Sequence, residues 1–138
     1  MVISWSAPSD NGTPITSYTV HIRKADNTFT EELSDCDGTD ATIVSATQCT
    51  IPHTSLIVAP FDLQLGYNID AKIVATNAYG SSSESAVGGG AVILLVPDSP
   101  VNLRNVVSIT ADNQVGLKWD DGYSNGGSVI IDYEVWYD

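Results

Sequence analysis

The sequence has few basic residues: 5 Lys and Arg stand against 17 Asp and Glu in 138 residues, a formal net charge of −12. A surface of that sign repels phosphate backbones and anionic lipid headgroups. We therefore expect neither nucleic acid nor a membrane surface among its partners. Charged residues of both signs make up only 16%, below the roughly one quarter of an average globular protein. Ser and Thr fill the rest of the polar surface, which favours an extracellular protein that carries covalent glycans.

Long hydrophobic runs are also absent. The longest, Ala91–Val96, has the length of a strand and is far shorter than the ~20 residues that a membrane-spanning helix needs. No signal peptide is present at the N-terminus, and the 3.6-residue periodicity of amphipathic helices is nearly missing. The sequence therefore predicts no membrane span and little helix.

Sequence motifs of catalysis and metal binding are lacking as well. The chain has two histidines, His21 and His53, and no Gly-x-Ser-x-Gly or phosphate-loop motif. The acidic stretch with Asp35, Asp37 and Asp40 does not have the spacing of a calcium loop, so a solvated loop is the favoured interpretation. We expect no enzyme, no cofactor and no metal.

The two cysteines, Cys36 and Cys49, are separated by twelve residues. Neither has a second Cys or a His at the spacing of a zinc site, so a disulfide that closes a local loop fits better. In the chain-entropy account such a bond contributes about 3 kcal/mol. A disulfide implies an oxidising compartment and so predicts an extracellular or cell-surface protein.

Period-two alternation is the dominant pattern. Tyr18, Val20 and Ile22 alternate with polar residues, and the 69–75 segment repeats the pattern more clearly. Such segments, with turn residues between them, predict an all-β antiparallel sandwich. The apolar run Ala91–Val96 is expected to be a further strand. The two prolines of Pro97–Pro100 predict a short, stiff linker between domains.

Beyond this linker the beginning of the sequence recurs. Val115, Leu117 and Trp119 match Met1, Ile3 and Trp5 at a distance of 114 residues, and Tyr133 matches Tyr18 at 115. This internal repeat predicts tandem modules. Residues 1–96 form a module without its first strand, 97–100 the linker, and 101–138 the first three strands of a second module. Either the chain is a window on a longer array, or a neighbouring copy supplies the missing strand.

The repeated segments resemble the fibronectin type III family. The segments that carry the resemblance are 97–103 with 115–119, the tyrosines Tyr18 and Tyr133, and residues 69–80 with the turn Asn77–Gly80. The resemblance implies an immunoglobulin-like Greek-key β-sandwich with the core signature Trp5, Tyr18, Trp119 and Tyr133. The Cys36–Cys49 insertion departs from typical members and resembles versions in surface proteins of protists.

The family implies spacing and adhesion modules and seldom catalysis, although fold alone does not define function. We expect a structural repeat of a secreted, glycosylated filament whose partners are copies of itself. Asn11, in the only Asn-x-Ser/Thr triplet, is the expected glycosylation site. Trp136 is expected to point outward and contact a neighbour. Two alternatives stay open: an adhesin or receptor module that binds protein or glycan through its loops, and an accessory module of a secreted glycan-degrading enzyme.

Overall fold

The computed structural model describes residues 1–137. Its contacts divide the chain into two compact units, Met1–Ile93 and the residues from Leu94 onward. This division falls before the expected linker. The backbone N–H of Leu95 donates to the Gly126 carbonyl, and that of Asp98 to the Ser124 carbonyl, both at 2.9 Å. The prolines at 97 and 100 therefore lie in a segment that is bonded to the second unit.

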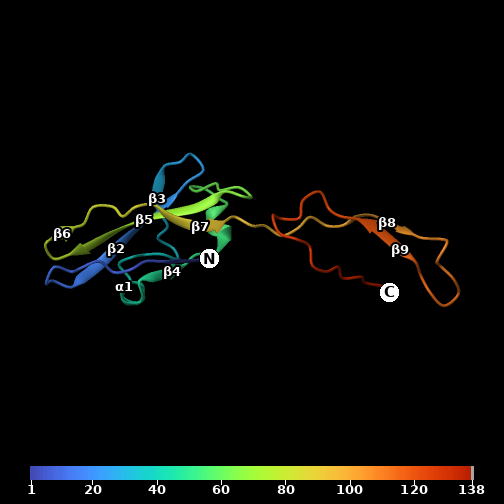
Figure 1. The fold of residues 1–138 in the computed structure, drawn as a ribbon, viewed down its shortest axis with the longest axis horizontal. Helices are drawn as coiled ribbons and strands as arrows, with labels where there is room; N and C mark the ends of the chain where they lie inside the picture. The colour runs from blue at the N-terminus through green and yellow to red at the C-terminus, as the bar shows by residue number, and fades with distance from the viewer. Residues whose placement is uncertain (138) are drawn as a thin grey trace. The chain divides into compact units, whose positions relative to one another are not determined.

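The first unit is built from two antiparallel sheets, which are coloured blue to yellow in Figure 1. One sheet pairs β1 (Val2–Ser4) with β4 (Gln48–Thr50). The other has the order β3-β2-β5-β6, with β7 also paired to β5. Its strands are β2 (Ile15–Arg23), β3 (Phe29–Glu31), β5 (Asn68–Asn77), β6 (Gly80–Ser81) and β7 (Gly88–Val92). The prediction of an antiparallel all-β fold is confirmed.

The core of the first unit lies between these two sheets. In β2 the side chains of Tyr18, Val20 and Ile22 are buried while their sequence neighbours are half-buried, as period-two alternation predicts. Val20 and Ile22 belong to one buried cluster, which also contains residues between 36 and 63 together with Ile69 and Ile93. The unit is thus sandwich-like, with its apolar layer between the sheets.

Two short helices lie in the part of the first unit that separates β3 from β5. Helix α1 spans Ala41–Ala46 and helix α2 spans His53–Leu56. The N-cap of α1 is Asp40, whose carboxylate accepts a hydrogen bond from the Thr42 N–H at 2.6 Å. The cysteine insertion therefore consists of turns and the short helix α1 before β4. A capped single turn leaves no periodic pattern from which it could be predicted.

The Ser-rich segment after β6 completes the edge of β5 with hydroxyl groups. The N–H groups of Ala75 and Ile73 donate to Oγ of Ser82 and of Ser85, each at 3.0 Å, while both serine N–H groups bond back to β5 carbonyls. The following strand is β7, Gly88–Val92, and not the expected Ala91–Val96. Pairing with β5 at Asn68–Ala71 determines which residues are in the strand, so the glycines are included and Leu94–Val96 are not.

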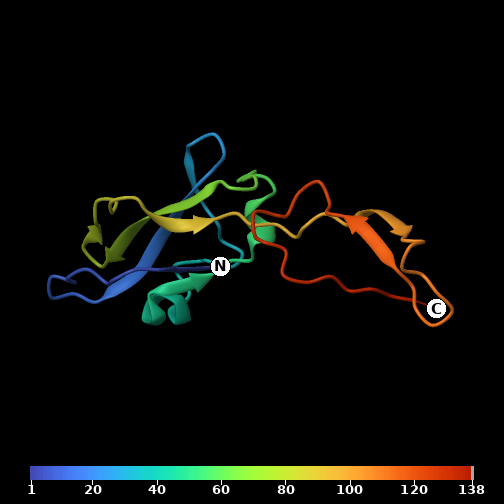
Figure 2. The same ribbon diagram turned by 45° about the vertical axis from the view of Figure 1, so that its right-hand side comes forward.

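The second unit contains one antiparallel hairpin, β8 (Val101–Asn105) with β9 (Leu117–Asp120). Figure 2 shows it in orange and red, followed by the chain up to residue 137. The expected third strand around Tyr133 is not formed. In the first unit the matching strand β2 is paired along most of its length with β5. The described part of the second unit has no counterpart of β5, so residues 129–137 have no ladder to join.

Gly38 allows the cysteine loop to approach β2 closely. Its carbonyl accepts the Tyr18 N–H at 2.9 Å, and a Cβ at this position would lie 1.9 Å from the Tyr18 carbonyl oxygen. We predict that Gly38→Ala lowers the free energy of unfolding by about 1–3 kcal/mol, the range for overpacking. Gly88→Ala is the matched control, because its Cβ meets nothing closer than 4.0 Å. Urea unfolding measures both, and equal stability of the two variants would contradict the prediction.

Candidate assembly surface

Strand β1 is paired along one edge only. Met1 and Ile51 exchange two backbone hydrogen bonds of 2.7 and 2.8 Å, and Trp5 donates to the Thr47 carbonyl at 3.0 Å. Backbone groups alternate in direction along a strand, so the odd-numbered residues are directed toward β4. The N–H and C=O groups of Val2 and Ser4 are directed to the opposite edge. No described strand pairs with them there.

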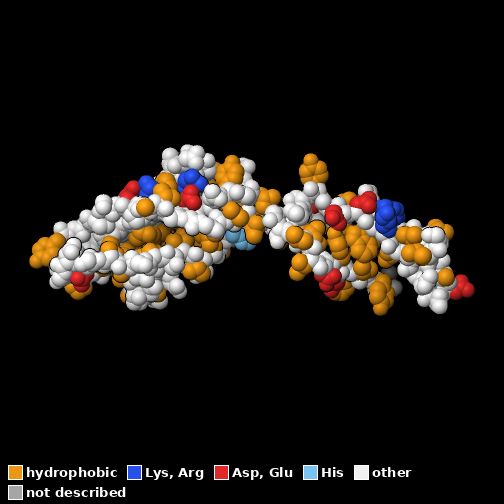
Figure 3. Space-filling model, in the orientation of Figure 1, with side chains coloured by type: hydrophobic (Ala, Val, Ile, Leu, Met, Phe, Trp, Pro, Cys, Tyr) orange, Lys and Arg blue, Asp and Glu red, His pale blue; other side chains and the backbone are white. Residues whose placement is uncertain are grey.

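A groove of about 320 Å³ runs beside this open edge. Residues 1–5 form one wall, and β5 and β7 form the other with the apolar side chains of Ile69, Ala71 and Ile73. In Figure 3 hydrophobic side chains are visible between the two layers of the first unit. The indole N–H of Trp5, which also lines the groove, is buried and has no acceptor in the described part of the chain. An open edge beside an apolar groove is the arrangement that receives an added strand.

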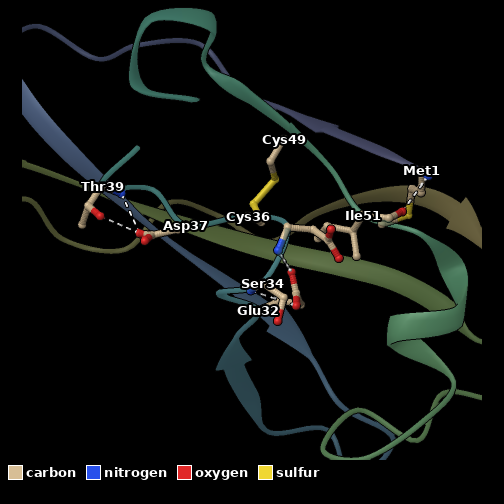
Figure 4. The surroundings of a disulfide bond; sticks show 9 residues. Met1, Glu32, Ser34, Cys36, Asp37, Thr39, Cys49 and Ile51 are labelled. Atoms are coloured by element: carbon tan, nitrogen blue, oxygen red, sulfur yellow. Dashed lines mark hydrogen bonds between the residues drawn. A yellow bond between two sulfur atoms is a disulfide. The ribbon is translucent and has the colours of Figure 1, made fainter. Parts of the chain in front are cut away.

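The disulfide holds the sheet that carries this edge. Cys36 and Cys49 are bonded, with their Cα atoms 5.2 Å apart, and both are buried in the core cluster. Cys49 lies in β4 directly opposite Ile3 of β1. Figure 4 shows the bond next to Ile51, whose carbonyl accepts the Met1 amine. The predicted disulfide is therefore present, and it ties β4, the only partner of β1 among residues 1–137, to the loop before α1.

The acidic residues near the disulfide accept hydrogen bonds from the backbone of their own turns. Asp37 accepts the Thr39 N–H at 2.9 Å, and this hydrogen bond lowers the pKa of the Asp37 carboxyl. The Thr42 N–H lowers the pKa of Asp40 in the same way. Within residues 1–137 no group of three or more His, Cys, Asp or Glu side chains is placed to hold a metal ion. Asp37 and Asp40 therefore serve as local hydrogen-bond acceptors for the backbone of their own loop.

The two histidines lie apart from each other in the fold. The Nδ1 atom of His21, on β2, lies 3.4 Å from a carboxylate oxygen of Glu84. Lys72 donates to the same carboxylate at 2.9 Å, and this hydrogen bond lowers the pKa of Glu84. His53 begins α2. The His21, Lys72 and Glu84 side chains thus form one polar cluster, which connects β2, β5 and the Ser-rich segment.

Asn11 lies in an exposed turn between β1 and β2. It has a φ of 52°, and the turn is held from β5, because the Asn77 amide donates to the carbonyls of Asp10 and Thr13 at 3.1 and 3.3 Å. Asn11 and Tyr79 line one shallow hollow, and Tyr79 is 91% exposed. The expected glycosylation site is therefore exposed on a fixed loop, and a large aromatic side chain is exposed beside it.

The four aromatic residues of the core signature form one similar pair in each unit. Trp5 and Tyr18 meet edge-on with ring centroids 5.1 Å apart and planes at 66°. Trp119 and Tyr133 do the same at 5.4 Å and 61°. The second pair is only half-buried, and the pKa of Tyr133 is raised because its hydroxyl donates to Asp121. Trp136 is 83% exposed.

The sequence signal for an open edge at β1 is the internal repeat, which predicts a first module without its first strand. The repeat aligns β9 with β1, and in the second unit β9 is paired with β8, the strand before it. A search of known protein-family models found no match to this chain. No helix in the described residues has the length and apolar character to cross a membrane.

Removal of the disulfide is expected to destabilise the sheet with β1. We predict that Cys36→Ala/Cys49→Ala lowers the free energy of unfolding by about 3 kcal/mol, the chain-entropy value for a loop of this size. Guanidinium unfolding of the variant and of the oxidised parent, followed by circular dichroism, measures the difference. Reduction of the parent with dithiothreitol is the control and should give the same loss. Unfolding midpoints that coincide with and without the bond would contradict this account of the support for β4.

Proposed function

We propose that this chain is a structural repeat of a secreted, glycosylated extracellular or cell-surface filament. Its Greek-key sandwich modules follow one another in tandem and join end to end. The observation that carries this proposal is the internal repeat together with the Trp–Tyr pair in each unit. Two copies of one packing motif in one chain are typical of tandem arrays, in which each module contacts its neighbours.

Exposed apolar side chains in the second unit support an assembled state. Most large hydrophobic residues from Leu103 onward are exposed, among them Val107 at 79%, Ile131 at 96% and Trp136 at 83%. Large exposed apolar surface is typical of contact sites. Copies of the same chain are the proposed partners.

The disulfide and the sequon support the proposed location. A buried disulfide is compatible with a secreted protein. Asn11 is exposed on its turn, where an N-linked glycan would meet no packed side chain. A sugar at this position, with the low surface charge, fits a filament surface that is kept soluble by glycans.

A binding module is the second candidate function. It is favoured by the fixed loop at Asn11 and the exposed ring of Tyr79 beside it. Exposed aromatic side chains on a rigid loop are typical of adhesive surfaces. A glycan on Asn11 would cover this hollow, so the occupancy of the sequon separates the two functions.

Electron microscopy of the native material, with intact-mass analysis of its subunit, tests the proposal. We expect fibres with an axial period of one or two modules and a mass in excess of the polypeptide. Enzymatic removal of N-glycans should lower the intact mass by the part of the excess that Asn11 carries. Discrete monomers of unmodified mass would contradict the filament and leave the binding module as the better function.

A further inference from the structure

We propose that the open edge of β1 accepts strand β8 of a second copy of this chain. The inference rests on the proposed filament and names the contact that joins its subunits. The donated segment, Val101–Asn105, would lie antiparallel to β1 and cover the groove beside it. Each copy contains both parts, a donor strand in its second unit and an acceptor edge in its first.

The internal repeat identifies the occupant. Gly116 and Lys118 of the β9 segment lie 114 residues after Val2 and Ser4. In the second unit the Gly116 carbonyl accepts the Val106 N–H at 2.7 Å, and Lys118 is in register with Arg104. Gly116, just before β9, and Lys118 in β9 thus face β8 and the adjoining Val106, and they correspond to the residues whose backbone groups are unpaired in β1. An edge with the same sequence pattern can bind the same strand.

The groove suits a strand of this composition. β8 contains Val101 and Leu103, which are 47% and 68% exposed in their own unit. On β1 these side chains would lie over the wall that Ile69, Ala71 and Ile73 form. Burial of apolar surface on both sides favours the exchange. The strand would also bring backbone carbonyls next to Trp5, whose buried indole N–H has no acceptor within residues 1–137.

Release of β8 from its own unit requires little disruption. All five of its residues are exposed, and its ladder with β9 has a register shift between Val101 and Arg104. A two-stranded hairpin is marginally stable in water by itself. The Arg104–Asp120 ion pair that would be broken is exposed, and such pairs contribute little. Exchange of β8 from β9 to β1 therefore replaces a weak pairing with one that also covers a core.

Cysteine crosslinking of two single variants tests the exchange. Ser4 occupies in β1 the place that Lys118 has opposite Arg104. Ser4→Cys and Arg104→Cys chains, mixed in a glutathione redox buffer, should form a covalent heterodimer at several times the yield of any homodimer. The control mixes Ser4→Cys with Tyr79→Cys, whose position is more exposed but lines a different hollow. That mixture should remain mostly uncoupled.

A proline variant separates edge pairing from folding. The N–H of Ser4 has no role in the β1–β4 ladder, so Ser4→Pro should keep the circular dichroism spectrum and the unfolding midpoint. Val2 occupies the place that Gly116 has opposite Val106, so Val2→Cys and Val106→Cys chains should form a heterodimer. Adding Ser4→Pro to the Val2→Cys chain should abolish this heterodimer. An unchanged yield would overturn the proposal.

Three outcomes would overturn the exchange between copies. The first is an equal heterodimer yield with the Tyr79→Cys control. The second is a dominant Ser4→Cys homodimer, which would mean that two β1 edges pair with each other. The third is a crosslink within single chains of the double variant Ser4→Cys/Arg104→Cys. None of these outcomes bears on whether the native material is a glycosylated fibre, which microscopy and mass analysis decide separately.

Discussion

Every backbone N–H and C=O in a packed strand needs a partner, and β1 meets this requirement on one side only. Its odd-numbered residues bond to β4, and those bonds place Met1, Ile3 and Trp5 against the core. The same alternation leaves the groups of Val2 and Ser4 at an open edge. The groove beside β1 and the half-covered inner face of β5 follow from this one-sided pairing.

The rest of the first unit keeps this edge in place. β4 is the partner of β1, and the disulfide joins Cys49 of β4 to Cys36, which lies two residues before the close approach of Gly38 to Tyr18. Tyr18 in turn packs edge-on against Trp5, at the end of the β1 segment. The core, the disulfide and the edge are thus connected through direct contacts.

Much of this arrangement could be predicted from the sequence, because strand alternation and the repeat are encoded locally. The alternation of β2 and β5, the disulfide and the Trp–Tyr pairing each have such a signal. The helix at Ala41–Ala46 and the serine hydroxyls of Ser82 and Ser85 do not, because a single capped turn has no period and a hydroxyl can bond the backbone in many settings. The limits of β7 also required the structure, since its glycines enter the strand only through pairing with β5. The segment around Tyr133 is not a strand for a related reason: the described part of the second unit has no strand that could pair with it as β5 pairs with β2.

Amide hydrogen exchange along β1 tests the one-sided pairing most directly. NMR can follow the N–H groups of Ser4 and Trp5 in a dilute, monomeric sample and in an assembled one. The account predicts that Trp5, bonded to the Thr47 carbonyl, is protected in both samples. Ser4 should exchange about as fast as a flexible peptide in the monomer and become protected on assembly. Protection of Ser4 in the monomer, or its continued fast exchange after assembly, would contradict the account.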